Sequence, residues 1–177
     1  MRFSSALAAA ATLAAGANAL DCTERMSSGT LSVWKTGIDF GTKINLAVDP
    51  TSHQVVTTTS GQNILPLYAC DGSTIVFPGS REIVITKGRI EAPGGCLGRN
   101  ATTGLVTSSP CIATEPAAQD QLWQFSLVYQ TDGEMTGSDR EIVPYKKGTF
   151  THISSGHLEL AKAEGPSKFF LTFDYVE

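Results

Sequence analysis

The sequence predicts an all-β domain of about a dozen short strands, and three observations lead to this prediction. No segment beyond residue 19 keeps apolar residues at i, i+3, i+4 and i+7 over three turns, so helical periodicity is nearly absent. Gly, Thr, Ser and Pro interrupt the chain every few residues, as they do between short strands. Short runs also alternate apolar with polar side chains, which is the pattern of a half-buried strand.

The clearest alternation lies at residues 123–130 and 169–175, where every second residue is large and apolar. Each of these runs has the length of an ordinary strand. The same pattern predicts further strands at Leu31–Lys35, Lys43–Val48, Gln54–Thr59, Ile64–Ala69, Thr74–Phe77, Glu82–Thr86, Arg89–Ala92, Leu105–Ser108, Glu141–Tyr145, Thr149–Ile153 and His157–Ala161.

Residues 1–19 are predicted to be a signal peptide and not part of the fold. Arg2 supplies a short positive start, Ala6–Ala15 form a small-residue apolar stretch, and Ala17-Asn18-Ala19 offers small residues for a signal peptidase. The stretch is shorter than the roughly 20 residues that span a bilayer, so a membrane anchor is not expected. We therefore expect a secreted, extracellular protein with a single domain over residues 20–177.

The net charge of the chain is −4 at pH 7. Nucleic acids and anionic membranes attract clustered Lys and Arg, so we expect neither as a partner. The sequence lacks Gly-x-Ser-x-Gly, His-Glu-x-x-His and a phosphate-binding glycine loop, and its three histidines lack zinc-ligand spacing. We therefore expect a protein that is not an enzyme and that holds no cofactor and no metal.

The four cysteines, Cys22, Cys70, Cys96 and Cys111, all follow the predicted cleavage site. An even number in an exported chain favours two disulfides over metal ligation, although the count alone allows three pairings. Asn100-Ala101-Thr102 is the one N-glycosylation sequon, so Asn100 is expected to be exposed and to carry a glycan.

An internal repeat of 48 residues predicts a specific architecture. Large apolar residues recur at this interval at two positions of short strands. They are Phe77, Phe125 and Phe173, and, two positions earlier, Ile75, Trp123 and Leu171. Three such units of about four strands, closed on one another, form a β-trefoil, which leaves no long open edge. A β-sandwich suits the number of strands equally well but does not account for the period.

Residues Gly95–Phe125 resemble one unit of the ricin-type β-trefoil lectins, the family marked by Gln-x-Trp. The family pattern runs Cys-Leu-Asp, a loop, a strand ending in aromatic-Pro-Cys, a polar loop and Asn-Gln-x-Trp. The equivalents here are Cys96-Leu97-Gly98, Ser109-Pro110-Cys111 and Asp120-Gln121-Leu122-Trp123. The two cysteines of one unit bond each other in that family. The resemblance therefore implies Cys96–Cys111, which leaves Cys22 to bond Cys70.

Gln121 and Trp123 are predicted to be structural residues even without the resemblance. Alternation places Trp123 on the face of Phe125 and Leu127, so its ring is expected in the core. Gln121 lies on that face at the start of the strand, and a buried amide needs hydrogen-bond partners, which backbone groups of nearby loops can supply. The motif thus argues for architecture and not for sugar binding.

The resemblance implies a sugar site built from a carboxylate after Cys-Leu, an aromatic residue before Pro-Cys and an amide before Gln-x-Trp. In the second unit these positions hold Gly98, Ser109 and Asp120. A glycine cannot accept hydrogen bonds from sugar hydroxyls, and a serine cannot stack on a sugar ring. The second unit is therefore expected to have lost its site.

The first unit is the predicted carbohydrate-binding site. Ile64–Cys70 looks like the aromatic-x-Cys segment of that unit, which places Tyr68 at the aromatic position. Ala47 falls at the carboxylate position, so the acid would be Asp49 or Asp71. In the third unit Glu159 is a candidate carboxylate without an aligned aromatic residue.

The leading hypothesis is a secreted, non-catalytic, lectin-like protein that binds an extracellular glycan or cell-wall polysaccharide through partly degraded sites. The alternative is a β-trefoil that binds a secreted protein through its loops, as a protease inhibitor or an effector. Function on this fold sits in loops, and the polar loops Ile112–Asp120 and Thr131–Arg140 are the candidate surfaces.

Overall fold

The computed structural model describes residues 19–36, 41–70, 75–77, 82–129, 135–145, 148–162 and 168–176. The predicted signal peptide, apart from Ala19, lies outside these residues, and so does Asp71. In the described part no helix has the length and apolar character of a membrane span.

The described chain is all-β, as predicted, with one short 3-10 helix, η1. The elements in order are β1 (Glu24–Lys35), β2 (Thr42–Val48), β3 (Val55–Thr57), β4 (Leu65–Ala69), β5 (Ile75–Phe77), β6 (Glu82–Ala92), β7 (Gly95–Arg99), β8 (Val106–Ser109), η1 (Ala117–Gln121), β9 (Trp123–Tyr129), β10 (Met135–Pro144), β11 (Phe150–Ser154), β12 (His157–Ala161) and β13 (Phe169–Tyr175).

Four differences separate these strands from the predicted ones. Strand β1 begins at Glu24, whereas the predicted strand begins at Leu31. Glu82–Thr86 and Arg89–Ala92 form one continuous strand, β6, because Gly88 stays extended and does not break it. Strand β7 was missed, since its glycines hide the alternation. Much of the expected loop Thr131–Arg140 is strand β10, which pairs with β9 through an irregular register.

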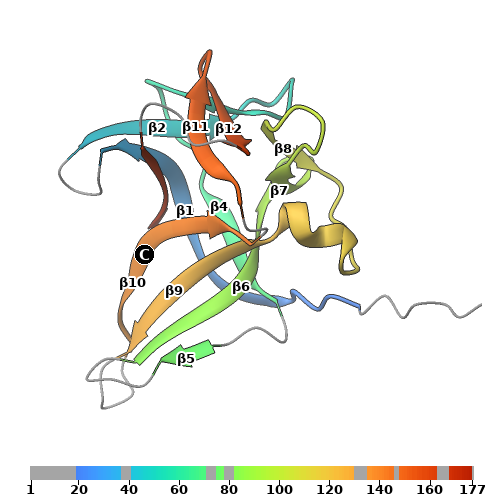
Figure 1. Cartoon of the computed structure of the whole chain (residues 1–177), viewed down its shortest axis with the longest axis vertical. Helices are drawn as coiled ribbons and strands as arrows, with labels where there is room; N and C mark the ends of the chain where they lie inside the picture. Colours follow the sequence, from blue (N-terminus) through green and yellow to red (C-terminus); the bar gives the residue numbers. More distant parts are fainter. Residues whose placement is uncertain are drawn as a thin grey trace, which may run out of the picture.

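Six strands close into a barrel (Figure 1). β1 pairs with β13 and β4, β6 pairs with β4 and β9, and β10 pairs with β9 and β13, all antiparallel. Each barrel strand therefore has a partner on both sides, which removes the open edges that promote aggregation. The buried core consists of Leu31, Val33, Leu46, Val48, Val55, Leu65, Leu67, Ile90, Leu97, Val106, Trp123, Phe125, Ile142, Leu158, Leu160, Leu171 and Phe173.

Three hairpins, β2–β3, β7–β8 and β11–β12, gather at one end of the barrel (Figure 1). Each hairpin contacts the other two through its second strand. The contacts are Gln54 with Thr107, Leu105 with Glu159, and His157 with Val56. The hairpins are thus related by a cyclic arrangement about the barrel axis.

The barrel pairings correct the predicted repeat. Leu67 pairs with Ile90, Phe125 with Ile142, and Phe173 with Leu31, so Leu67 and not Phe77 corresponds to the two later phenylalanines. Phe77 lies in β5, which pairs with β6 outside the ring. The additional strand β5 lengthens the chain between β4 and β6, and the first interval is therefore longer than predicted.

Both predicted disulfides are present. Cys22–Cys70 joins the segment before β1 to the residue after β4, and Cys96–Cys111 joins β7 to the loop after β8. A second, smaller apolar cluster forms around the first bridge. It consists of Cys70, Ala118 and Leu122, with Leu20, Cys22 and Tyr145 packed against it.

Candidate functional site

Trp123 lies in the core at the start of β9, as predicted. Its side chain is 2% exposed. The indole Nε1 donates a hydrogen bond of 3.0 Å to the carbonyl oxygen of Leu97 in β7. The ring therefore fills the barrel and also fastens the second hairpin to it, because a buried indole N–H needs such an acceptor.

Gln121, at the end of η1, fastens this short helix to the end of β8 and the loop that follows it. Its Oε1 accepts a hydrogen bond of 2.8 Å from the N–H of Ile112. Its Nε2 donates to the carbonyl of Pro110 at 3.0 Å and to Oγ of Ser109 at 2.9 Å. The amide is 4% exposed, so loop groups satisfy a buried polar group, as predicted.

Gly98 leaves no room for a carboxylate at the position where the lectin family carries one. A Cβ atom there would lie 2.6 Å from the carbonyl oxygen of Asp120 and 2.7 Å from Cγ of Gln121. Gly98 is itself buried. The segment that carries Gln121 therefore packs directly against Gly98 and leaves no space for a side chain there.

The variant Gly98→Asp is accordingly expected to destabilise the protein and not to create a sugar site. Overpacking against backbone costs about 1–3 kcal/mol, and Gly98→Ala, which adds the same Cβ without a charge, should lose a similar amount. Urea unfolding of the three proteins measures this. Gly61→Ala is the matched control, since nothing lies within 4 Å of its added Cβ. A Gly98→Asp protein as stable as the parent would show that the position is open.

The contacts between hairpins identify corresponding positions in the three hairpins. In each hairpin one second-strand residue contacts the hairpin that precedes it in the ring, namely Val56, Thr107 or Glu159. The first-strand residue that pairs with it holds the position of Gly98. These residues are Ala47, opposite Val56, Gly98, opposite Thr107, and His152, opposite Glu159. The sequence match that gave Glu159 the carboxylate position is therefore wrong, because Glu159 lies in the second strand of its hairpin whereas Gly98 lies in the first.

Tyr68 lies in a barrel strand and not in a hairpin. It pairs with Arg25 of β1 on one side and with Arg89 of β6 on the other. Ser109, by contrast, ends the second strand of a hairpin, opposite Cys96. The alignment of Tyr68 with the aromatic position does not hold in this topology. Cys70 suggested this alignment. However, Cys70 follows the barrel strand β4 and bonds Cys22 before β1, so this disulfide does not belong to a hairpin.

Asp49 closes its own turn between β2 and β3. Its Oδ1 accepts hydrogen bonds from the N–H of Ser52 at 2.6 Å, from Oγ of Ser52 at 2.9 Å and from the N–H of Thr51 at 3.0 Å. The hydrogen bonds from Ser52 are the main cause that holds the pKa of Asp49 below its ordinary value. In the described part of the chain the contacts of Asp49 lie within its turn, away from β4, and Asp71 falls outside that part.

The sequon residue Asn100 is exposed in the turn between β7 and β8. Its Oδ1 accepts hydrogen bonds from the N–H groups of Thr102 at 2.9 Å and Thr103 at 3.0 Å. The exposure expected of a sequon is present, and glycosylation of Asn100 remains a prediction.

The loop Ile112–Asp120 is held against the barrel by buried cations. Arg89 donates 2.8 Å to the carbonyl of Ile112, and Lys87 Nζ lies 2.5 Å from Oε1 of Glu115. Burial lowers the pKa of Arg89. The N–H of Leu20 also bonds the carbonyl of Ala113 at 2.8 Å. This loop is therefore anchored along its first half.

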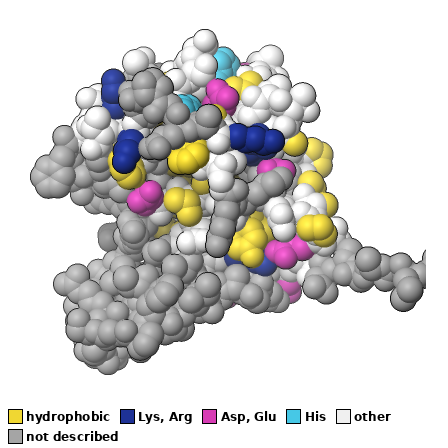
Figure 2. Space-filling view, viewed as in Figure 1, with side chains coloured by type: hydrophobic (Ala, Val, Ile, Leu, Met, Phe, Trp, Pro, Cys, Tyr) yellow, Lys and Arg dark blue, Asp and Glu magenta, His cyan; other side chains and the backbone are white. Residues whose placement is uncertain are grey.

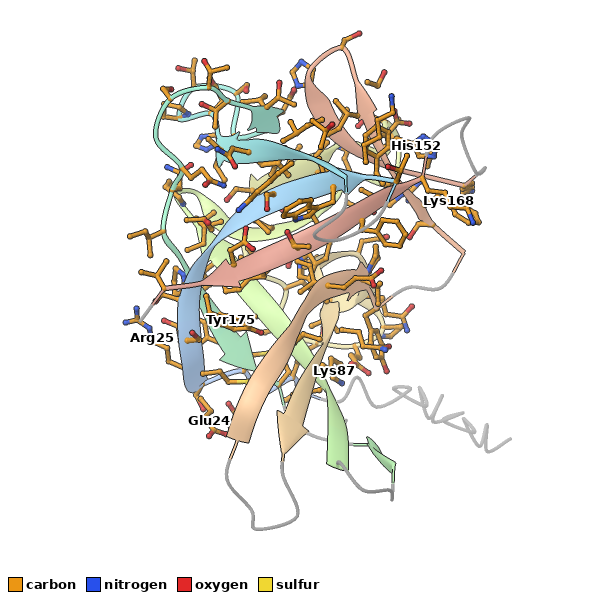
Figure 3. All side chains as sticks on the ribbon, turned by 90° about the vertical axis from the view of Figure 1, so that its left-hand side faces the viewer. Glu24, Arg25, Lys87, His152, Lys168 and Tyr175 are labelled. Carbon is orange, nitrogen blue, oxygen red and sulfur yellow. A yellow bond between two sulfur atoms is a disulfide. The ribbon has the colours of Figure 1, made fainter. Side chains whose placement is uncertain are left out.

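A polar cluster on the outer side of β1, β2 and β13 was not predicted from the sequence. Oγ of Ser32 donates 2.6 Å to Oδ2 of Asp174, and Nζ of Lys43 lies 2.9 Å from the same oxygen. Oγ1 of Thr172 lies 2.8 Å from Oγ of Ser32. The Lys43 ammonium also sits 5.8 Å from the ring centre of Trp34. We call these five residues the outer face; Figure 3 looks onto the three strands that carry them.

Comparisons with known proteins identify no relative. No family model, curated protein or solved structure matches the chain. Among the described residues, one group has metal-ligand side chains close together, namely Glu91, Cys96 and Cys111. Its two cysteines are bonded to each other, so their sulfur atoms do not act as thiolate ligands.

Proposed function

We propose that the chain is a secreted, non-catalytic carbohydrate-binding protein with a β-trefoil fold similar to that of the ricin-type lectins. The closed ring of six strands supports the fold, together with the three hairpins and their cyclic contacts. In a β-trefoil each unit contributes two barrel strands and one hairpin, and the present pairings follow that rule once β5 is set aside.

The functional proposal comes from the resemblance to the lectin family, and the construction of the second unit supports the fold that this resemblance implies. Its hairpin is closed by Cys96–Cys111, its loop is held by Gln121, and its core position is filled by Trp123. These are the residues on which the resemblance rests, and each performs the structural role expected of it. The two disulfides also suit an extracellular protein.

The same geometry argues that the sugar does not bind in the hairpins. Ala47, Gly98 and His152 occupy the position of the family's carboxylate, and none of them carries one. Lectin sites need a carboxylate or amide that orients sugar hydroxyls and an aromatic face for the ring. Retained binding must therefore use another part of the surface.

Retention on immobilised neutral glycans tests the proposal. We expect the secreted protein to be delayed on at least one of galactose, chitin and β-glucan columns. We also expect Tyr68→Ala to be delayed equally, because Tyr68 lies between two arginines of the barrel wall. Passage of the wild-type protein through all three columns would contradict the carbohydrate proposal, and loss of binding in Tyr68→Ala alone would restore the first-unit site.

A protein-binding role is the second candidate, favoured by the anchored loop Ile112–Asp120. A loop fixed before binding loses little entropy when it docks. Substrate-like inhibition through Ile112 is disfavoured, since its N–H bonds Gln121 and its carbonyl bonds Arg89. Inhibition assays against a panel of secreted proteases separate this role from carbohydrate binding. Any inhibition by the parent protein should persist in Ile112→Ala, because the backbone groups of Ile112 are already bonded within the protein.

A further inference from the structure

We infer that the carbohydrate site lies on the outer face and takes a neutral saccharide. This inference rests on the proposed carbohydrate-binding function and gives it a location. The outer face places the Asp174 carboxylate and the Lys43 ammonium beside the Trp34 indole. The hydroxyls of Ser32 and Thr172 are fully buried behind them, and the Ser32 hydroxyl holds the Asp174 carboxylate in place. Lys87, Glu115 and Tyr145 also join an ammonium, a carboxylate and an aromatic ring among the described residues, but Lys87 is buried there and holds the loop Ile112–Asp120.

The backbone holds these groups in place. Ser32 pairs with Thr172 of β13 and with Asn45 of β2, while Trp34 pairs with Lys43. Leu31 and Val33, which precede Ser32 and Trp34 respectively, are buried in the core. Because side chains alternate along a strand, Ser32 and Trp34 share the opposite side of β1, where Ser32 is covered completely and Trp34 stays partly exposed. A site on paired strands is fixed more precisely than one on loops.

The polar groups match what sugar hydroxyls need. Both contacts to Asp174 use Oδ2, from Ser32 at 2.6 Å and Lys43 at 2.9 Å. A carboxylate has two oxygens with about four acceptor sites, so it can also accept from ligand hydroxyls. The ammonium has three donors and sits on a flexible stem that is 38% exposed. Donor and acceptor thus stand side by side, as vicinal hydroxyls require.

Trp34 supplies the apolar surface on which a sugar ring can stack. Its side chain is half-buried, and the exposed Lys43 ammonium lies over its ring. A cation over a ring at an exposed site is held weakly, so a saccharide can displace the Lys43 ammonium from the ring while its ion pair with Asp174 remains. The indole Nε1 is buried without a hydrogen-bond partner among the described residues. A saccharide would therefore contact the exposed part of the ring and not this buried N–H.

The charges decide between a neutral and an acidic saccharide. Lys43 is paired with Asp174, so the pair has no net charge to attract a uronate or a phosphate. An acidic sugar would also meet the Asp174 carboxylate, and like charges repel. Figure 2 shows Lys and Arg side chains interspersed with Asp and Glu on the surface in view. The ligand class is therefore a neutral oligosaccharide.

Asp174→Asn and Asp49→Asn form a matched pair for the test. Both replace a carboxylate by an amide of the same shape, the first on the outer face and the second in the β2–β3 turn. Calorimetric titration uses lactose, chitotetraose and laminaritetraose as neutral probes and tetragalacturonate as the acidic one. We expect Asp174→Asn to weaken binding of the bound neutral probe about tenfold or more, since a charged acceptor is lost. Asp49→Asn should bind as the parent does.

Trp34→Phe keeps an aromatic ring and leaves the Asp174 contacts in place. It should weaken binding several-fold. If Asp174→Asn unfolds in a thermal melt, Trp34→Phe alone tests whether the outer face binds the saccharide.

If the parent binds a neutral probe and both outer-face variants bind it equally well, the location is overturned and the proposed function stays intact. Loss in Asp49→Asn alone would assign the site to the hairpin turn. Preference for tetragalacturonate would overturn the ligand class, and a parent that binds none of the probes would overturn function and location together.

Discussion

Trp123→Ala is expected to lower the free energy of unfolding by about 3–5 kcal/mol, the cost of truncating a large buried aromatic residue. The ring is 2% exposed, and its indole bonds the carbonyl of Leu97. The variant loses core packing inside the barrel and leaves that buried carbonyl without its donor. Domains of this size are stable by about 5–15 kcal/mol, so the loss is a large fraction of the total.

Equilibrium unfolding in urea, followed by far-UV circular dichroism, measures this effect. Trp34→Ala is the matched control, because it is the same substitution at the half-buried ring on the outer face. It should cost clearly less than Trp123→Ala. Equal losses in the two variants would contradict the assignment of Trp123 to the core and Trp34 to the surface.

Replacing both cysteines of Cys22–Cys70 by alanine is expected to cost about 4 kcal/mol. The bridge closes a loop of 48 residues, and loop-closure entropy removed from the unfolded chain grows with loop length. The bridge Cys96–Cys111 spans 15 residues and should contribute about 3 kcal/mol by the same relation. Losing the first bridge also releases Leu20 and Cys22 from the second apolar cluster.

Parallel urea unfolding of the two double variants, each without reducing agent, provides the comparison. The longer loop should lose more stability than the shorter one. If the Cys22–Cys70 variant unfolds at the same urea concentration as the parent, the bridge does not constrain the domain in solution. The opposite order would show that the second hairpin, and not the N-terminal segment, contributes most of the disulfide stabilisation.

The sequence predicted the fold class and the second unit well because their signals are local. Trp123 and Phe125 are two residues apart on one strand, and Gln121 reaches partners no more than twelve residues away. Cys96 and Cys111 are also only 15 residues apart, on either side of the β7–β8 turn. Such features survive loop insertions elsewhere in the chain.

The first unit was predicted poorly because an insertion shifted its register. Strand β5 places Phe77 at the repeat interval, although Leu67 holds the corresponding barrel position. Gly29 and Gly88 both sit where a Cβ would overlap the ring of a core phenylalanine, Phe173 or Phe125. The constraint there is steric contact in the barrel and not sequence spacing.

The outer face could not have been predicted, because its members come from both ends of the chain. Ser32 and Asp174 are 142 residues apart, and only the antiparallel pairing of β1 with β13 brings them together. Alternation in β1 does indicate that Ser32 and Trp34 point away from the core. It cannot indicate which residues of other strands lie beside them.

The chain has two tryptophans, so nitrogen-15 NMR of their indole N–H groups tests the central claim most directly. The titrant is the soluble oligosaccharide that corresponds to the column on which the protein is delayed. It should shift the Trp34 indole signal in proportion to saturation. The Trp123 indole, buried and bonded to Leu97, should keep its position. A shift of Trp123 with Trp34 unchanged would place the sugar at the second hairpin, and it would contradict the account given for the outer face.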